Sequence, residues 1–379
     1  MSFNDFSTPY RWERLTGAKK TAAAAPGGMI DLSVGSPVDD VPESVQTALS
    51  AAADAPNAYG YPTTVGTPDL QEAISEWFRD VRGTDLAAIR ASVIPSVGSK
   101  EAVALMASLL QLAPGARVVQ PEVSYPTYEI GTQLAGGTIV KTNVTDPSTW
   151  EHLDNVGMVW VNSPSNPTGE TLSARQLAAI VAAARRIGAV VVSDECYALM
   201  HWDGGVNGSF TAAPGILDPE VCGGSAEGIL CLYSLSKQSN MAGYRTAFIA
   251  GDSEILSKMQ VFRKQIGLII PGPVQAAMAA GLRDTAATAL QHRRYDARLH
   301  TLVEGLQAAG YDAAMPQGAL YVWVKAKSGD CWEDIAALAR VGIIASPGEF
   351  YGDKGYLRFS STASDAQIAE TAERLRQLA

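Results

Sequence analysis

The chain has 379 residues, 47% of them hydrophobic and 18% charged, which exceeds what one small core needs and predicts a large domain with a smaller one. Its net charge of −10 argues against a nucleic-acid partner, because a phosphate backbone requires a basic surface. The first fifteen residues lack a secretory pattern and no apolar run approaches ~18 residues, so we expect neither a signal peptide nor a membrane partner.

Seven short apolar runs predict the strands of one sheet. Most are apolar at consecutive positions, which is typical of strands covered on both faces. Helical patterns separate them, among them residues 101–112 and residues 173–187, where Ser173 is expected as the N-cap. This alternation predicts an α/β fold with a mostly parallel sheet. The runs are residues 91–97, 116–121, 137–142, 156–162, 188–194, 228–234 and 246–251.

The pattern changes after Pro271-Gly272-Pro273, where a smaller α+β domain is predicted. A long helical stretch over residues 274–309 precedes two strand patterns, 321–327 and 356–360. Residues 1–40 are too irregular to fold alone, and we expect them to pack on the small domain. The predicted division is therefore 1–40, 41–272 and 273–379.

Polar residues follow the predicted strands, where open α/β sheets bind ligands. Gly98, Ser99 and Lys100 follow the first strand and open a helix, whose free N–H groups form an anion site suited to a phosphate. Asn166 lies in the segment 162–169, Asn-Ser-Pro-Ser-Asn-Pro-Thr-Gly, which in isolation is typical of a Pro-rich turn. Neither segment identifies a ligand by itself.

Asp194 and Lys237 follow two later strands along the chain. A carboxylate such as Asp194 at a strand end is often a helix N-cap or a satisfied buried acid. Lys237 stands beside Ser234 and Ser236, where it could bind a phosphate, lie in solvent or form a Schiff base. Arg245 comes eight residues later (245 − 237), immediately before another apolar strand. The residues alone leave these alternatives open.

The four cysteines and four histidines carry no metal-site spacing. Neither CxxC nor HExxH occurs, so we expect no bound metal and no disulfide framework. Free thiols are typical of a reducing compartment, which predicts a cytoplasmic protein. Cys196 is expected to be buried packing rather than a reactive group.

The ordered motifs YxP, GSK, NPTG, DECY, SLSK, GYR and YLR resemble the class I/II aminotransferases of fold type I, which use pyridoxal 5'-phosphate (PLP). The likeness covers almost the whole chain. It implies a large domain with a mostly parallel seven-stranded sheet, a small α+β C-terminal domain, and a homodimer with shared active sites. It also implies that the substrates are amino acids and 2-oxo acids.

The resemblance implies a role for each matching residue. Lys237 would hold PLP as a Schiff base and move the substrate proton, while Asp194 would pair with the pyridine nitrogen. Arg358 and the Gly35 backbone would bind the substrate α-carboxylate. The other residues implied to contact the cofactor are Asn166 and Tyr197 at the ring hydroxyl, Tyr125 at the ring face, Ser99, Lys100 (through its N–H), Ser234, Ser236 and Arg245 at the phosphate, and Tyr61 at the phosphate of the partner subunit.

Longer segments resemble one branch, the actinobacterial N-succinyldiaminopimelate aminotransferases. They are DLSVGSPVDD, VNSPSNPTG, SDECYALMHWD, LDPEVC and SLSKQSN. The implied reaction is transamination between N-succinyl-LL-2,6-diaminopimelate and 2-oxoglutarate in lysine biosynthesis. An aminotransferase for aromatic or branched-chain amino acids and a PLP-dependent C–S β-lyase stay open as alternatives. A PLP-sensing regulatory module is disfavoured, because the chain has no basic helix-turn-helix segment.

Some positions are not settled by the resemblance. Arg263 and Lys264 precede a stretch that in relatives borders the pocket, so they could bind the distal carboxylates or equally form a solvated helix face. Ser239 and Asn240 stand where the family commonly has an aromatic and a small residue, and Ala247 stands where it often has glycine. These departures imply a distinct branch.

Overall fold

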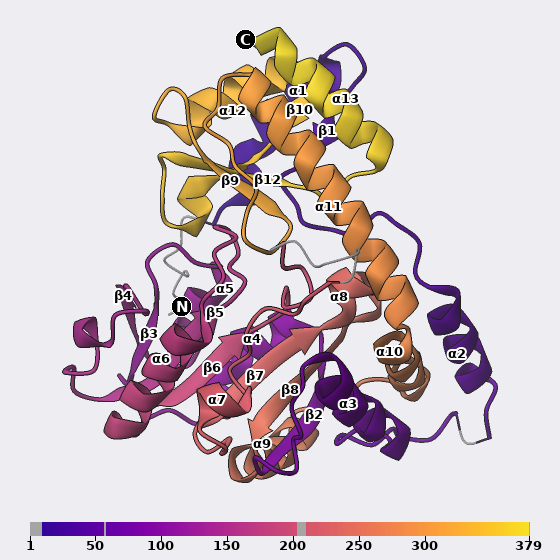
Figure 1. Cartoon of the computed structure of the whole chain (residues 1–379), viewed down its shortest axis with the longest axis vertical. Coiled ribbons are helices and arrows are strands. Elements are labelled where there is room, and N and C mark those ends of the chain that lie inside the picture. Colours follow the sequence, from indigo (N-terminus) through magenta and orange to yellow (C-terminus); the bar gives the residue numbers. More distant parts are fainter. Residues whose placement is uncertain (1–9, 57, 203–209, 379) are drawn as a thin grey trace, which may run out of the picture.

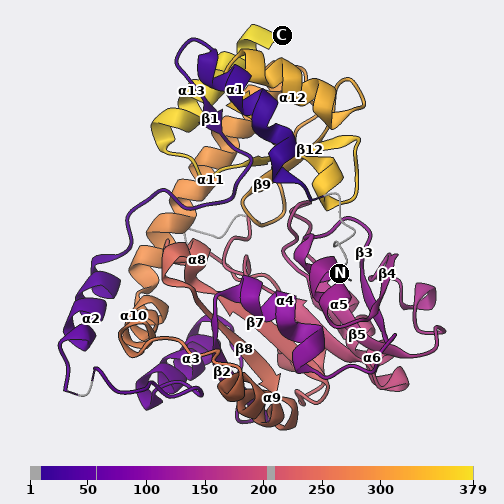
Figure 2. The same ribbon diagram turned by 180° about the vertical axis from the view of Figure 1, so that it is seen from behind.

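The computed structural model describes residues 10–56, 58–202 and 210–378 of the chain. Figure 1 shows a large lobe built on one broad sheet and a small lobe above it, which holds both the C-terminal helix and α1 (Thr16–Ala24). The helix α11 (Thr285–Ala308) runs from one lobe to the other, and Figure 2 shows the same arrangement from behind.

Seven strands form the sheet of the large lobe in the order β2-β8-β7-β6-β5-β3-β4. β8 runs antiparallel to both of its neighbours, and the other paired strands run parallel. This confirms the mostly parallel seven-stranded sheet that the sequence predicts. The strands are β2 (Ala91–Val97), β3 (Arg117–Pro121), β4 (Thr138–Thr142), β5 (Val156–Asn162), β6 (Val190–Asp194), β7 (Ile229–Ser234) and β8 (Thr246–Asp252).

Helices cover both faces of this sheet, which is why its strands are apolar at consecutive positions. Val191 and Cys231 belong to the core on one face, and Val192 and Leu230 belong to the core on the other. α7 lies in front of the sheet in Figure 1, and α4 lies in front of it in Figure 2. The first core includes residues of α3 (Pro68–Val81), α6 (Ala174–Ile187) and α7 (Pro219–Cys222), and the second includes residues of α4 (Ser99–Leu109), α5 (Thr127–Leu134) and α9 (Ser253–Gln265).

The ends of α6 show how local sequence sets a helix boundary. The Ser173 hydroxyl accepts a hydrogen bond from the Gln176 N–H at 3.3 Å, and the Gln176 side chain accepts one from the Ser173 N–H at 3.0 Å. Gly188 ends the helix at a φ of 70°, a left-handed conformation in which glycine carries no steric penalty. The predicted N-cap at Ser173 is confirmed.

The small lobe has an antiparallel sheet, β11-β12-β9, and a parallel pair, β1-β10. Leu15 and Leu32 pack in the same core as Leu302 and Phe359, so the N-terminal segment contributes to this lobe. Residues 1–9 of the predicted segment lie outside the described residues, and the division at 40 and 272 stays a prediction. The elements are β1 (Ile30–Asp31), β9 (Tyr321–Lys325), β10 (Ile343–Ile344), β11 (Ser346–Pro347), β12 (Tyr356–Ser360), α12 (Cys331–Arg340) and α13 (Asp365–Leu375).

The long helical stretch predicted over residues 274–309 is divided between two helices. α10 (Gly272–Arg283) ends at Asp284, whose ψ of 73° departs from helical geometry. The Asp284 carboxylate then accepts a hydrogen bond from the Ala287 N–H at 2.9 Å and caps α11. Helix-favouring residues lie on both sides of Asp284, so the sequence pattern continues across the break.

Two further findings concern the described ranges as a whole. No helix in them is both long and apolar enough to cross a membrane. Among these same residues, no three His, Cys, Asp or Glu side chains gather as a metal-binding group. The remaining elements are α2 (Glu43–Ala53), α8 (Leu235–Gln238) and the 3-10 turns Trp12–Leu15, Pro147–Thr149, Ala242–Tyr244, Gly348–Tyr351 and Arg376–Leu378.

Candidate active site

A cavity of about 370 Å³ lies where the strands of the large sheet end. β5, β6 and β7 run parallel, so their carboxyl ends meet at one edge and deliver Asn162, Asp194 and Ser234. β8 runs the opposite way, so Arg245, which precedes it, reaches the same edge. Arg358 on β12 brings the small lobe to the other side of the cavity. This is the position at which open α/β sheets bind ligands.

The cavity gathers the predicted site residues with one exception. Tyr61 does not line it, and its side chain is fully exposed on its own chain. The predicted residues that line the cavity are Gly35, Ser99, Lys100, Tyr125, Asn166, Asp194, Tyr197, Ser234, Ser236, Lys237, Arg245 and Arg358.

Lys237 projects into the cavity from α8, directly after β7. Its Nζ donates a hydrogen bond to the backbone carbonyl of Gly35. Burial lowers the pKa of Lys237 below its ordinary value; the phenol of Tyr321 opposes this effect, and the positive charge of Arg358 adds to it. A lysine with a lowered pKa has more of the neutral amine that nucleophilic and proton-transfer chemistry requires.

Asp194 is a buried carboxylate at the end of β6. Its oxygens accept hydrogen bonds from the Tyr128 hydroxyl at 2.9 Å and the Cys196 N–H at 3.2 Å. Burial raises the pKa of Asp194, and the bonds from Cys196 and Tyr128 oppose that rise. In the part of the chain that the structure describes, Asp194 forms no ion pair, so a cationic ring nitrogen would supply the missing positive partner.

Arg358 is buried in β12, the central strand of the small sheet. Its guanidinium donates to the Asn166 side-chain oxygen at 2.8 Å and to the Ser33 carbonyl at 2.7 Å. The rings of Tyr321 and Tyr351 lie 4.0 Å and 4.8 Å from its central carbon. Among the described residues its Nε has no hydrogen-bond partner, so one donor of the fork is free for an anion.

The first turn of α4 and Arg245 form a second cationic region of the cavity. Gly98, the N-cap of α4, makes no side-chain cap bond, which leaves the first N–H groups of Ser99 and Lys100 for an anion. Gly98 has a φ of 75°, a left-handed conformation that favours glycine, and a Cβ there would lie 2.1 Å from an Arg245 guanidinium nitrogen, which would have to shift. Ser236 completes this side, with its hydroxyl 2.8 Å from that of Ser234.

The whole chain also has known relatives. Residues 27–375 match the family Aminotransferase class I and II. The chain is a class I and II aminotransferase. This family and its fold depend on PLP, which confirms the predicted cofactor and enzyme class.

The aminotransferase is similar to proteins whose names differ in substrate. It is 40% identical over 97% of its length to a 4-dedimethylamino-4-oxo-anhydrotetracycline transaminase of Streptomyces rimosus, covering 98% of that protein. It is 40% identical to a probable aminotransferase of Mycobacterium tuberculosis, covering 97% of this chain and 84% of that one. A solved structure of a probable N-succinyldiaminopimelate aminotransferase from Thermus thermophilus matches with a TM-score of 0.84 at 25% identity, covering 97% of this chain and all of that one (100%).

The residues of the cavity fit PLP. The cofactor needs an anion site for its phosphate, a carboxylate for its ring nitrogen and an amine for its aldehyde. Three parts of the cavity lining meet these needs. They are the N-terminal end of α4 with Arg245, the carboxylate of Asp194 and the amine of Lys237. The φ of 75° at Gly98, which favours glycine, lets the first turn of α4 and Arg245 approach each other closely.

Arg263 and Lys264, for which distal-carboxylate binding and a solvated helix face were both left open, do not line the cavity. Arg263 is neither solvated nor in the pocket: it is buried and donates two hydrogen bonds to Glu101, at 2.8 Å and 3.0 Å. Lys264 is exposed on the surface of α9. A helical pattern cannot show which face meets α4, so Arg263 was assigned to the wrong surroundings.

Several lining residues of the aminotransferase were not predicted. Tyr10 and Trp12 come from the N-terminal segment, and Tyr321 and Tyr351 come from the small lobe. The Tyr321 hydroxyl lies 2.7 Å from that of Tyr197. Their sequence context is an ordinary apolar strand or an irregular segment, so only the packing of the two lobes reveals them. Cys196, predicted as buried packing, forms part of the cavity wall.

Proposed function

We propose that this aminotransferase exchanges the amino group between N-succinyl-LL-2,6-diaminopimelate and 2-oxoglutarate, in the cytoplasmic synthesis of diaminopimelate and lysine. The observation that carries the proposal is the charge of the cavity. Among the described residues, the cations Lys100, Arg245 and Arg358 and the reactive Lys237 line it against one carboxylate, Asp194, although the whole chain has a net charge of −10. Such a site favours ligands with several negative charges.

The four basic residues of the cavity have different roles in this proposal. Arg245 and the α4 end take the phosphate of PLP, Arg358 takes the α-carboxylate, and Lys237 reacts. Lys100 then remains for a further carboxylate. Among the described residues its ammonium makes no ion pair, and it lies 5.9 Å from the centre of the Tyr10 ring. N-succinyl-diaminopimelate carries the additional carboxylates that such a cation would bind.

The proposed roles of the other residues come from the family resemblance, and each of these residues lines the cavity. Bound PLP supplies an electron sink for the substrate carbon. Lys237 holds the cofactor covalently and, when its amine is free, moves the proton at the substrate α-carbon. With PLP bound, Asp194 would hold the ring nitrogen in its charged form, and Asn166 and Tyr197 would contact the ring hydroxyl. Tyr125 would pack on the ring face.

A second substrate class is supported by the Streptomyces rimosus relative. That protein is named for a tetracyclic oxo compound, and this chain is 40% identical to it. The aromatic residues Tyr10, Trp12 and Tyr125 in the cavity wall would suit a bulky cyclic substrate as well as a peptide-like succinyl chain. Substrate comparison separates the two classes.

Replacing Lys100 by methionine should lower kcat/KM for N-succinyl-diaminopimelate by about 10–100-fold, the effect of one lost charge-assisted hydrogen bond. Leucine and phenylalanine have no distal carboxylate, so their kcat/KM values should change less than about threefold in the same variant. Methionine keeps the length of the side chain without its charge. The measurement is a set of initial rates for each donor with 2-oxoglutarate.

Lys264→Met is the matched control, because Lys264 is an exposed lysine outside the cavity. It should leave all donors unchanged. If phenylalanine or leucine outperforms the succinylated donor in the unmodified enzyme, the substrate assignment is wrong and only the broader aminotransferase assignment survives.

A homodimer with shared sites is the second part of the proposal. Tyr59 and Tyr61 are exposed by 94% and 101% on the single chain, an unusual state for neighbouring aromatic residues in one segment. In the proposal Tyr61 contacts the phosphate bound by the partner subunit. Tyr61→Phe and Lys237→Ala subunits, each impaired alone, should therefore complement each other when mixed.

Complementation arises because each mixed dimer contains one site with both lesions and one site with neither. An equal mixture should recover about a quarter of the activity of the unmodified enzyme, since half of the dimers are mixed. A mixture that stays as inactive as its components, or a monomer in sedimentation at assay concentration, would contradict site sharing.

A further inference from the structure

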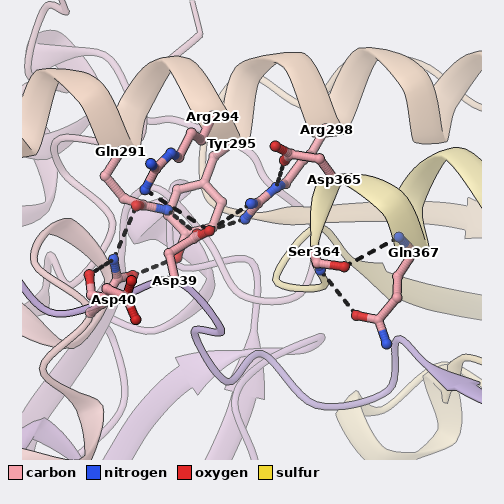
Figure 3. A network of polar contacts seen from close by, with 10 residues as sticks. Asp39, Asp40, Gln291, Arg294, Tyr295, Arg298, Ser364, Asp365 and Gln367 are labelled. Atoms are coloured by element: carbon pink, nitrogen blue, oxygen red, sulfur yellow. Dashed lines mark hydrogen bonds and ion pairs between the residues drawn. The ribbon is translucent and has the colours of Figure 1, made fainter.

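A largely buried polar network lies outside the cavity lining (Figure 3). We call it the Asp39 network; its members are Asp39, Asn240, Gln291 and Arg298. Asp39 belongs to the segment before α2, Asn240 to the loop after Lys237, and the other two to α11. The network therefore joins three parts of the chain that are distant in sequence.

Arg298 is the centre of the Asp39 network. Its guanidinium donates to both Asp39 oxygens at 2.7 Å, and its Nε donates to Asp365 at 2.6 Å, as Figure 3 shows. Gln291 donates to Asp39 at 2.8 Å from two turns earlier on the same face of α11. Burial raises the pKa of Asp39, but the hydrogen bonds from Arg298 and Gln291 outweigh it and lower the pKa below its usual range. Asp39 is therefore a charged, bidentate anchor.

Asn240 ties the loop of the reactive lysine to the same segment. It lies three residues after Lys237, and its side-chain amide donates to the Asp40 carbonyl at 3.1 Å and to Gln291 at 3.0 Å. Its φ of 54° is a left-handed conformation that asparagine tolerates better than most residues. The small residue commonly found here in the family could make neither side-chain bond.

The other end of this segment reaches the cavity through backbone carbonyls. The Ser33 carbonyl accepts from Arg358 at 2.7 Å, and the Gly35 carbonyl accepts from Lys237. Val34 and Val38 are exposed by 46% and 52%, so apolar burial contributes little to holding the segment in place. Polar anchors must hold it instead, and one of them is the Thr362 hydroxyl, which donates to the Val34 carbonyl at 3.2 Å.

We propose that Asp39 and Asn240 are positioning residues, which fix the segment Ser33–Asp40 so that its carbonyls orient Arg358 and Lys237. The inference rests on the proposed roles of Arg358 and Lys237. One anchor, through Asp39, ties the segment to α11; the other, through Asn240, ties it to the lysine loop. The same anchored segment therefore orients both Arg358, which binds the carboxylate, and Lys237, which reacts.

The test compares Asp39→Asn with Asp365→Asn. Both changes remove a carboxylate from the same guanidinium, but Asp365 is 77% exposed and lies on α13, away from the segment. The probe is 2-oxoglutarate added to the PLP-loaded enzyme, where it binds without reacting because no amino group is available. Its dissociation constant, read from the visible absorbance, should rise roughly tenfold in Asp39→Asn, since a charge-assisted bond is lost, and less than twofold in Asp365→Asn.

Hydrogen–deuterium exchange of the cofactor-free protein gives a second readout. Exchange of the amides between residues 32 and 40 should rise in Asp39→Asn and stay unchanged in Asp365→Asn. Equal effects of the two substitutions, or a lower melting temperature with unchanged 2-oxoglutarate binding, would overturn the proposal and leave a purely structural network.

Asn240→Ala keeps the proposal testable if Asp39→Asn does not fold. It removes the amide bonds to Asp40 and Gln291 and the bond that Asn240 accepts from the Tyr295 hydroxyl at 3.4 Å, and it should weaken 2-oxoglutarate binding by roughly threefold, the lower end for a neutral hydrogen bond. An unchanged dissociation constant would overturn the role of Asn240. If the unmodified enzyme does not bind 2-oxoglutarate, the proposed function itself fails. If the unmodified enzyme and its variants bind 2-oxoglutarate equally well, only the positioning role fails.

Discussion

Lys237→Ala should lower the rate of transamination by about 10²–10⁴-fold or more, because it removes both the amine that holds PLP and the group that moves the substrate proton. PLP should still bind, since the α4 end, Arg245 and Asp194 remain to contact the phosphate and the ring nitrogen. The measurements are kcat with 2-oxoglutarate and the PLP content after gel filtration.

Lys100→Ala provides a lysine control in the same cavity for Lys237→Ala. Lys100 faces the cavity but is not placed at the reacting carbon, so this variant should keep its kcat with substrates that lack a distal carboxylate. Equal losses in the two variants would show that positive charge in the cavity, rather than the amine of Lys237, supports the rate.

Arg358→Lys should lower kcat/KM by about 10–100-fold for every amino donor, because lysine cannot reproduce the planar fork that meets a carboxylate. The loss should fall mainly on KM, since Arg358 binds a group that does not change during the reaction. The buried position between Tyr321 and Tyr351 also suits the flat guanidinium better than an ammonium group. Initial rates with several donors measure this.

Arg374→Lys is the matched control for Arg358→Lys, because Arg374 is a buried arginine of α13 that donates to the Gly28 carbonyl and to Glu370 rather than to the cavity. It should lower the melting temperature and leave KM unchanged. A KM that stays constant in Arg358→Lys, or a loss confined to a single donor, would remove Arg358 from the general carboxylate site.

The sheet and most of the cavity could be predicted because their signals are local. Consecutive apolar residues indicate strands that are covered on both faces. Polar residues at the carboxyl ends of parallel strands, here Asn162, Asp194 and Ser234, must meet at one edge of the sheet. Arg245 was assigned through the family motif alone, because the antiparallel direction of β8, which brings Arg245 to that edge, is not visible in the sequence. The order of the motifs along the chain then indicated the aminotransferase family, and the family match over residues 27–375 confirms it.

The remaining features depend on packing between distant segments, which no local pattern encodes. Arg263 shares its helix with exposed neighbours, and only the contact between α9 and α4 pairs it with Glu101. Tyr10 and Tyr321 reach the cavity because the N-terminal segment and the small lobe close over it. Asn240 was visible as a departure from the family, but its purpose depends on the position of α11.

Borohydride reduction followed by peptide mass mapping tests the central claim most directly. The purified protein should be yellow, and reduction should fix one phosphopyridoxyl group per chain on the peptide that contains Lys237. Lys100 also lines the cavity, so the two peptides can be compared in one experiment. A phosphopyridoxyl group on Lys100, on a lysine outside the cavity or on no lysine at all would contradict the account.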